Sequence, residues 1–172
     1  MSEKKLPEVW LRGPMENIPT LLQPVAHALL QAKEEVTELM KSFPDDLLWI
    51  KPAGAASVGF HLQHLSGVID RLFTYANGKS LSQEQLASLK AEGYPQQNKA
   101  TVAELVEAFG RQVEMALKEL QRMDEQTLTE YRGVGRAQLP SNVMGLLFHA
   151  AEHTMRHLGQ LIVTVKVVFD RD

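Results

Sequence analysis

Residues 22–43 read LQPVAHALLQAKEEVTELMKSF, and their apolar positions recur at alternating intervals of three and four. Because an α-helix completes a turn every 3.6 residues, this spacing places one apolar stripe along a single helix face, as in a helical bundle. Proline fits only the first turn of a helix, so the helix is expected to begin at Pro19 or Pro24 and to end at Pro44. The stripe consists of Leu22, Val25, Leu29, Ala32, Val36, Leu39 and Phe43.

Capping residues and apolar spacing predict two further long helices downstream. One runs from an N-cap at Ser57 to a stop at Asn77-Gly78. The other opens at Thr101, which has the spacing of a capping box with Glu104.

The rest of the chain predicts one short and one long helix. A short helix is expected within residues 80–97, where Ser82 and Gln85 form a second capping box. Residues 124–140 are expected to be irregular. The last long helix is expected over residues 141–168; its valine-rich end would also suit a strand, but continuity with the preceding segment favours helix. The sequence therefore predicts an all-α protein.

Length and composition narrow the class of protein. The 172 residues suit one domain over residues 1–172, with residues 1–16 as an N-terminal arm whose Trp10 packs on the body. A net charge of −3 argues against nucleic acid or an anionic membrane as partner. The chain has no cysteine, which excludes disulfides and thiolate ligands. It also lacks a signal-peptide core and an apolar run of membrane-span length, so a cytoplasmic location is expected.

Three histidines on the predicted last helix have a spacing that suits metal binding. His149, His153 and His157 are spaced four residues apart, so neighbouring side chains lie about 5–6 Å apart on one face. The row drifts by about 40° per step, which brings His153 and His157 closest to the apolar face. Gln160 follows one turn later and is a candidate to hydrogen-bond a ligand or a bound water.

The second predicted helix carries two more histidines. His61 lies within its apolar sector and His64 at the edge, and spacing alone does not choose between them. Either one would complete a site of three imidazoles with His153 and His157. Three protein ligands with one open position are typical of a catalytic metal, and imidazole suits zinc, nickel, iron and copper alike.

Other catalytic patterns are absent from the sequence. The segment from His153 to His157 lacks the glutamate of H-E-x-x-H, which argues against a zinc peptidase. No E-x-x-H occurs, which disfavours a ferritin-like di-iron centre.

Two segments resemble the DinB-like superfamily, with similarity extending over residues 20–168. They are Ser57-Val-Gly-Phe-His-Leu-Gln-His-Leu65 and Glu152-His-Thr-Met-Arg-His-Leu-Gly-Gln160. Members pair a histidine on helix two with H-x-x-x-H-x-G-Q on the last helix. Matched residue by residue, the resemblance implies His64, His153 and His157 as metal ligands. His61 and His149 are additional to that triad and are the candidate catalytic residues.

The resemblance also implies a fold, a cofactor and an assembly. The expected fold is a four-helix bundle in up-down-down-up order, with the short helix in the crossover between helices two and three. The expected cofactor is a divalent ion, zinc or nickel foremost and iron or manganese as alternatives. Homodimers are common in the family, and the apolar residues Phe148, Met155 and Ile162 are candidates for such an interface.

Three functions follow as hypotheses. Characterised members include S-transferases of small thiols, so a metal-dependent transferase acting on a thiol cosubstrate is expected first. Arg71 or Arg156 would then hold a carboxylate of the cosubstrate. The second hypothesis is a hydrolase that uses water activated by the metal, with His149 or His61 as general base. The third is a non-catalytic, dimeric metal-binding module.

Overall fold

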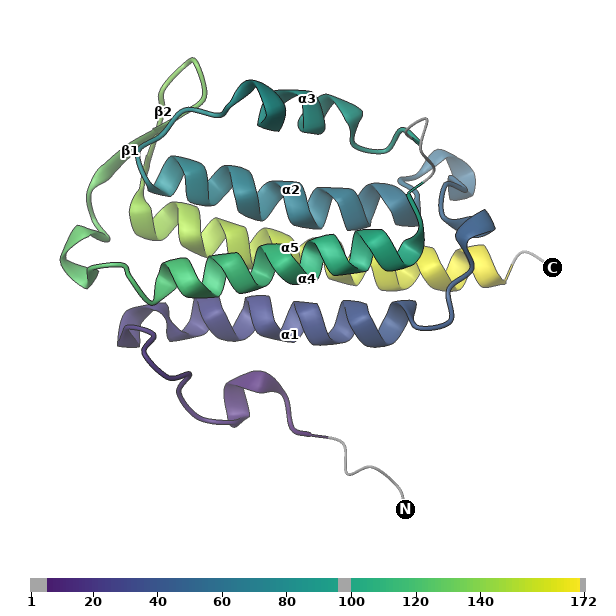
Figure 1. Ribbon diagram of the computed structural model, residues 1–172, viewed down its shortest axis with the longest axis horizontal. Helices are drawn as coiled ribbons and strands as arrows, with labels where there is room; N and C mark the ends of the chain where they lie inside the picture. The colour runs from purple at the N-terminus through teal and green to yellow at the C-terminus, as the bar shows by residue number, and fades with distance from the viewer. Residues whose placement is uncertain (1–5, 96–99, 171–172) are drawn as a thin grey trace.

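The computed structural model describes residues 6–95 and 100–170 and is mainly helical, as expected (Figure 1). No helix in these two stretches has both the length and the apolar character needed to cross a membrane. The α-helices are α1 (Gln23–Met40), α2 (Val58–Ala76), α3 (Gln83–Ala91), α4 (Val102–Leu120) and α5 (Val143–Phe169). A hairpin of β1 (Tyr131–Val134) and β2 (Leu139–Asn142) precedes α5.

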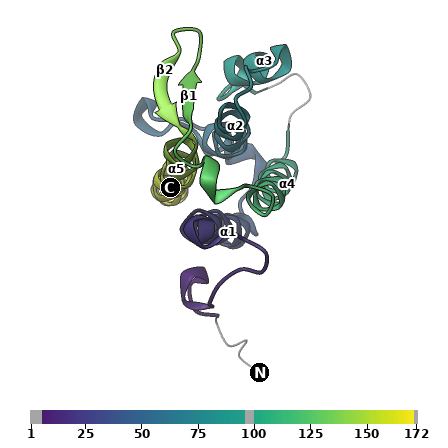
Figure 2. The same ribbon diagram turned by 90° about the vertical axis from the view of Figure 1, so that its left-hand side faces the viewer.

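The four long helices lie side by side and enclose one core. Both α1 and α2 pack against α4 and α5, whereas α3 lies outside the bundle, next to α2 (Figure 2). The apolar stripe of residues 22–43 faces inward, so the core is built from the periodic positions of all four helices. Its fully buried side chains include Leu29, Val36, Leu62, Ile69, Phe109, Leu147 and Leu161.

The caps and the apolar patterning place the helices as predicted, with small differences at the ends. Both capping boxes form, at Ser82 and at Thr101, and Ser57 caps α2 by accepting a hydrogen bond from the Phe60 N–H. In α1, Pro24 lies in the first turn, where a missing N–H costs nothing. The helix ends at Met40, before Pro44 is reached.

The expectation of irregular structure over residues 124–140 is wrong at its C-terminal end. Tyr131 pairs with Asn142 and Val134 with Leu139 in a short antiparallel hairpin. The two four-residue strands show no alternation of apolar and polar residues. Backbone pairing forms them, so the sequence pattern does not predict them. The hairpin also sets the start of α5, because the Asn142 side chain accepts a hydrogen bond from the Gly145 N–H.

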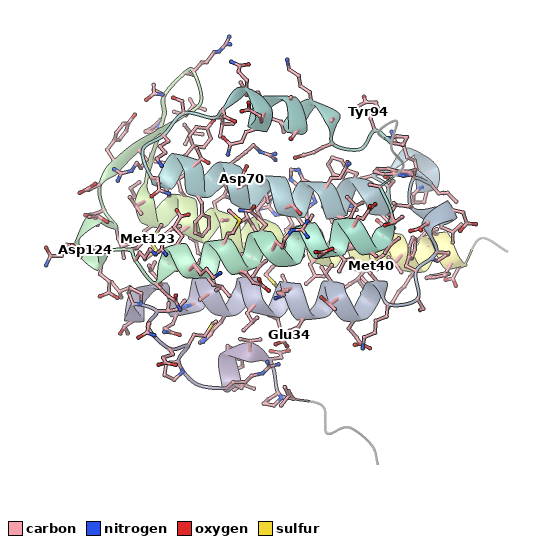
Figure 3. All side chains as sticks on the ribbon, in the orientation of Figure 1. Glu34, Met40, Asp70, Tyr94, Met123 and Asp124 are labelled. Atoms are coloured by element: carbon pink, nitrogen blue, oxygen red, sulfur yellow. The ribbon has the colours of Figure 1, made fainter. Side chains whose placement is uncertain are left out.

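The N-terminal arm is attached differently from the prediction. Trp10 does not pack on the body; it is 62% exposed. Val9 is the buried residue instead, and its backbone N–H donates to Oε1 of Gln31 at 2.8 Å. The Arg12 guanidinium forms two hydrogen bonds with Glu34, which lies on the side of α1 that faces the arm (Figure 3). Val9, the partly buried Met15 and polar contacts therefore hold the described part of the arm.

Candidate metal centre

Three histidines meet where α2 packs against α5. His64, His153 and His157 each offer a ring nitrogen, and these atoms all lie within 4.8 Å of one another. Nε2 of His64 is 2.9 Å from Nε2 of His153. Two nitrogens bound to one tetrahedral zinc lie roughly 3.3 Å apart, given Zn–N bonds of about 2.0–2.1 Å. The donor set therefore fits a divalent ion of the imidazole-binding kind.

A buried carboxylate orients the first of these histidines. Oε2 of Glu92 lies 2.6 Å from Nδ1 of His64, and its Oε1 accepts a hydrogen bond from Arg71 at 2.6 Å. Burial raises the pKa of Glu92, but the hydrogen bonds from His64 and Arg71 outweigh it and hold the pKa below its usual value. An ionised carboxylate only accepts, so His64 carries a hydrogen on Nδ1, which leaves Nε2, the nitrogen that faces His153, as the one that could bind a metal.

Two glycines allow the Glu92 segment to reach α2. A Cβ on Gly67 would lie 2.4 Å from Nη1 of Arg71 and 2.5 Å from Oε1 of Glu92, so the missing side chain leaves room for this ion pair. Gly93 has φ +81°, a left-handed conformation that favours glycine. Its N–H donates to Oε1 of Gln63 at 2.9 Å. The chain just after α3 is thus docked on the helix that carries His64.

His61 lies behind the triad rather than within it. It is 3% exposed, and its Nδ1 is 3.1 Å from Nδ1 of His157. Burial, with a smaller effect of the neighbouring His64, lowers the pKa of both His61 and His157 to about 4. The pKa of His153 is also lowered, chiefly by burial. These rings are neutral at pH 7, which is the form that binds metal.

The remaining predicted site residues lie around this group. Arg71 is 8% exposed and holds Glu92. Arg156 is exposed and pairs with Glu152. Gln160 is exposed, and no hydrogen bond joins it to the three histidines among the residues described. The functional roles assigned to these side chains stay predictions.

Two cavities lie elsewhere on the molecule. One of about 870 Å³ lies between α1 and α4, and one of about 1090 Å³ lies between α2, α3 and the hairpin. None of the three histidines lines either of them. The triad is reached instead through its own partly exposed edges, since the side chain of His64 is 16% exposed. The sizes of these two cavities therefore do not identify the candidate site.

Glu92 is the site residue that the sequence analysis missed. It lies 28 positions after His64, beyond a separate short helix, so no helical spacing connects the two. The one indication is Arg71, two turns after His64 on α2 and close to its apolar side. A buried arginine requires a carboxylate partner, although the sequence does not show which one.

Comparison with known proteins bears on the fold and the family of the chain. Residues 28–161 match the family model of the DinB superfamily. A conserved protein from Enterococcus faecalis is 18% identical, with a TM-score of 0.66, and the similarity covers 87% of this chain and 98% of that chain. A DinB-like protein from Bacillus cereus is 17% identical, with a TM-score of 0.57 and coverage of 80% and 89%. No match was found among curated proteins.

These comparisons define a family without defining a reaction. The two solved structures share so little sequence that they bear on the fold alone. The family model, in contrast, spans more than half of the chain and includes His64, His153 and His157. The chain therefore belongs to the DinB superfamily.

Proposed function

We propose that this protein is a divalent-metal-dependent enzyme that transfers a small thiol to an electrophile. The observation that carries the proposal is the group of His64, His153 and His157, with His64 oriented by buried Glu92. A divalent ion held there, zinc or nickel foremost, would lower the pKa of a thiol and so supply a nucleophile at neutral pH. The lowered pKa values of His153 and His157 support this assignment, because neutral imidazoles bind metal without first losing a proton.

The chain's own residues favour an external thiol. It has no cysteine, so the sulfur comes from a cosubstrate. Arg156 pairs with Glu152 one turn away. Because Arg156 is exposed, a carboxylate of the cosubstrate can reach its guanidinium from solvent. Arg71 is already committed to Glu92, which makes Arg156 the better candidate of the two.

His61 and His149, the two additional histidines, have different proposed roles. His61 is buried against His157, so it fixes the orientation of that ring. The side chain of His149 is 49% exposed, and its ring centroid lies 5.0 Å from that of His153. His149 is therefore the better candidate to exchange a proton with solvent.

We also infer a homodimer through the outer face of α5. Of the three residues expected at such an interface, Phe148 is 63% exposed, whereas Met155 and Ile162 are partly buried against the core. Val163 and Val167, exposed by 60% and 45%, extend the apolar face instead. Gly159 lies between Phe148 and Val163 and has no neighbour within 4 Å of an added Cβ, which would allow a second helix to approach closely. Sedimentation of the wild type and of Val163→Glu tests this: a dimer should become a monomer, whereas a wild-type monomer would refute it.

The transfer reaction is tested on untagged protein loaded with zinc or nickel. Bacillithiol, mycothiol, glutathione and cysteine are each offered with monochlorobimane, and conjugate formation is followed by fluorescence. Turnover should require metal and should be lost in His64→Ala and His153→Ala but kept in His27→Ala, a histidine outside the site. Metal binding without turnover of any thiol would leave the non-catalytic module. Ester or amide cleavage without thiol would favour the hydrolase.

A further inference from the structure

A second group of potential ligands lies on α5, one turn before the triad's His157. His149, Glu152 and His153 each offer one atom, and these atoms lie within 4.8 Å of one another. Nδ1 of His149 is 3.4 Å from Oε2 of Glu152. That separation is close to the edge of about 3.3 Å between two ligands of a tetrahedral ion. The spacing i, i+3, i+4 brings all three side chains to one face of the helix.

Two atoms in this group are buried without a hydrogen bond. They are Oε2 of Glu152 and Nδ1 of His153, and neither has a hydrogen-bond partner within the described part of the chain. Buried polar atoms are nearly always satisfied, so an orphaned pair on adjacent residues requires an explanation. A cation between them would satisfy both atoms at once.

The two nitrogens of His153 serve different sides of the ring. Nε2 faces His64 at 2.9 Å and belongs to the triad. Nδ1 of His153 lies on the other side of the ring and has no hydrogen-bond partner among the described residues, whereas Nδ1 of His64 is hydrogen-bonded to Glu92. Nδ1 of His157 faces His61, so within the described residues His153 is the triad histidine whose second nitrogen has no partner.

We propose that His149, Glu152 and Nδ1 of His153 bind a second, weaker divalent cation, so that the His153 ring bridges two ions. The Nδ1 proton of His153 is released to solvent when this ion binds, and His149 then acts as a ligand and no longer as a proton carrier. Two imidazoles and one carboxylate suit zinc or copper. The positive Arg156 holds the other oxygen of Glu152, and its charge makes this site weaker than the triad. The inference rests on the proposed metal centre only through the shared His153.

The experiment is a zinc titration of untagged protein by calorimetry, with bound metal counted by mass spectrometry. Wild type and the control His27→Ala should bind two equivalents, the second more weakly. His149→Ala and Glu152→Gln should each keep the first equivalent and lose the second. One equivalent in the wild type, or a second equivalent that survives both substitutions, would overturn the proposal.

A magnetic measurement tests the bridge itself. With copper in both sites, ions joined through one imidazole ring should couple, and the electron paramagnetic resonance signal should be weaker than the sum of two isolated ions. Two additive signals would refute bridging by His153. His64→Ala separates the two proposals, since it should lose the first equivalent and keep the second. If His64→Ala keeps both equivalents while His149→Ala loses one, the triad fails as a metal site and the second site stands.

Discussion

Oε2 of Glu92 lies 2.6 Å from Nδ1 of His64, although Glu92 follows a helix that lies outside the bundle. The contact means that the orientation of a triad histidine depends on a segment that contributes nothing to the core. Arg71 completes the arrangement from the same helix as His64, so one carboxylate is held by two side chains of α2.

Replacing Glu92 by glutamine should weaken zinc binding by about 10–100-fold, because a neutral amide orients His64 less well and does not fix its tautomer. The affinity is measured by competition with a chromophoric chelator. Glu107→Gln is the matched control, since Glu107 forms an exposed pair with Arg111 on α4 and should leave the affinity unchanged. Equal affinities in both variants would show that Glu92 does not support the site.

Placing a methyl group at Gly67 should disturb the same ion pair. The new Cβ would overlap the side chains of Arg71 and Glu92, which would have to move. Gly67→Ala is therefore expected to lower the free energy of unfolding by about 1–3 kcal/mol and to weaken metal binding. Gly110→Ala is the control: it lies in helix α4, where an added Cβ would make only an ordinary 3.5 Å contact with Lys33, and the variant should be stabilised by up to about 1 kcal/mol. Urea unfolding compares the two; a stabilised Gly67→Ala would contradict the arrangement.

Acid should destabilise the metal-free protein between pH 6.5 and 4. Burial lowers the pKa of His61 to about 4 from 6.5, so in this window the unfolded chain binds more protons than the folded one. The associated stability is complete above pH 6.5 and is lost as the pH falls toward 4.

For His61 this loss amounts to about 2–3 kcal/mol, since a difference of one pKa unit corresponds to about 1.4 kcal/mol. Thermal unfolding followed by circular dichroism at several pH values measures it. His61→Leu should show a smaller dependence on pH than the wild type. A melting temperature that stays constant from pH 7 to 4 would refute the assignment.

Asn142 rather than Ser141 should be the cap of α5. Asn142→Ala removes the acceptor for the Gly145 N–H and is expected to cost about 0.5–2 kcal/mol. Ser141→Ala should cost little, because the Ser141 hydroxyl makes only a 3.5 Å contact with the Asn142 carbonyl. Urea unfolding measures the difference: Asn142→Ala should have the lower midpoint, and a lower midpoint for Ser141→Ala would contradict the assignment.

The long helices could be predicted because their information is local. Caps such as Thr101 act within one turn, and the apolar stripe of α1 follows directly from helix geometry. The pairing of His153 with His157 came from the same source, since residues four apart share a face. His64 was harder, because its position at the site depends on how α2 is rotated against α5.

The features that sequence reasoning missed depend on contacts between distant segments. Glu92 reaches His64 only after the chain folds back past α3, and no periodicity records that path. The hairpin forms through backbone pairing between residues whose side chains show no strand pattern. The burial of Val9 in place of Trp10 depends on which side of a single turn meets α1.

The docking of the α3 segment on α2 separates two tasks that many enzymes assign to the same residues. The bundle supplies the three histidines and the core, while the segment just after α3 supplies the carboxylate that contacts His64. If the triad binds a metal as proposed, substitutions in that segment would alter the binding without repacking the interior. Such a division would let the surroundings of His64 change through a segment that has no side chain in the core.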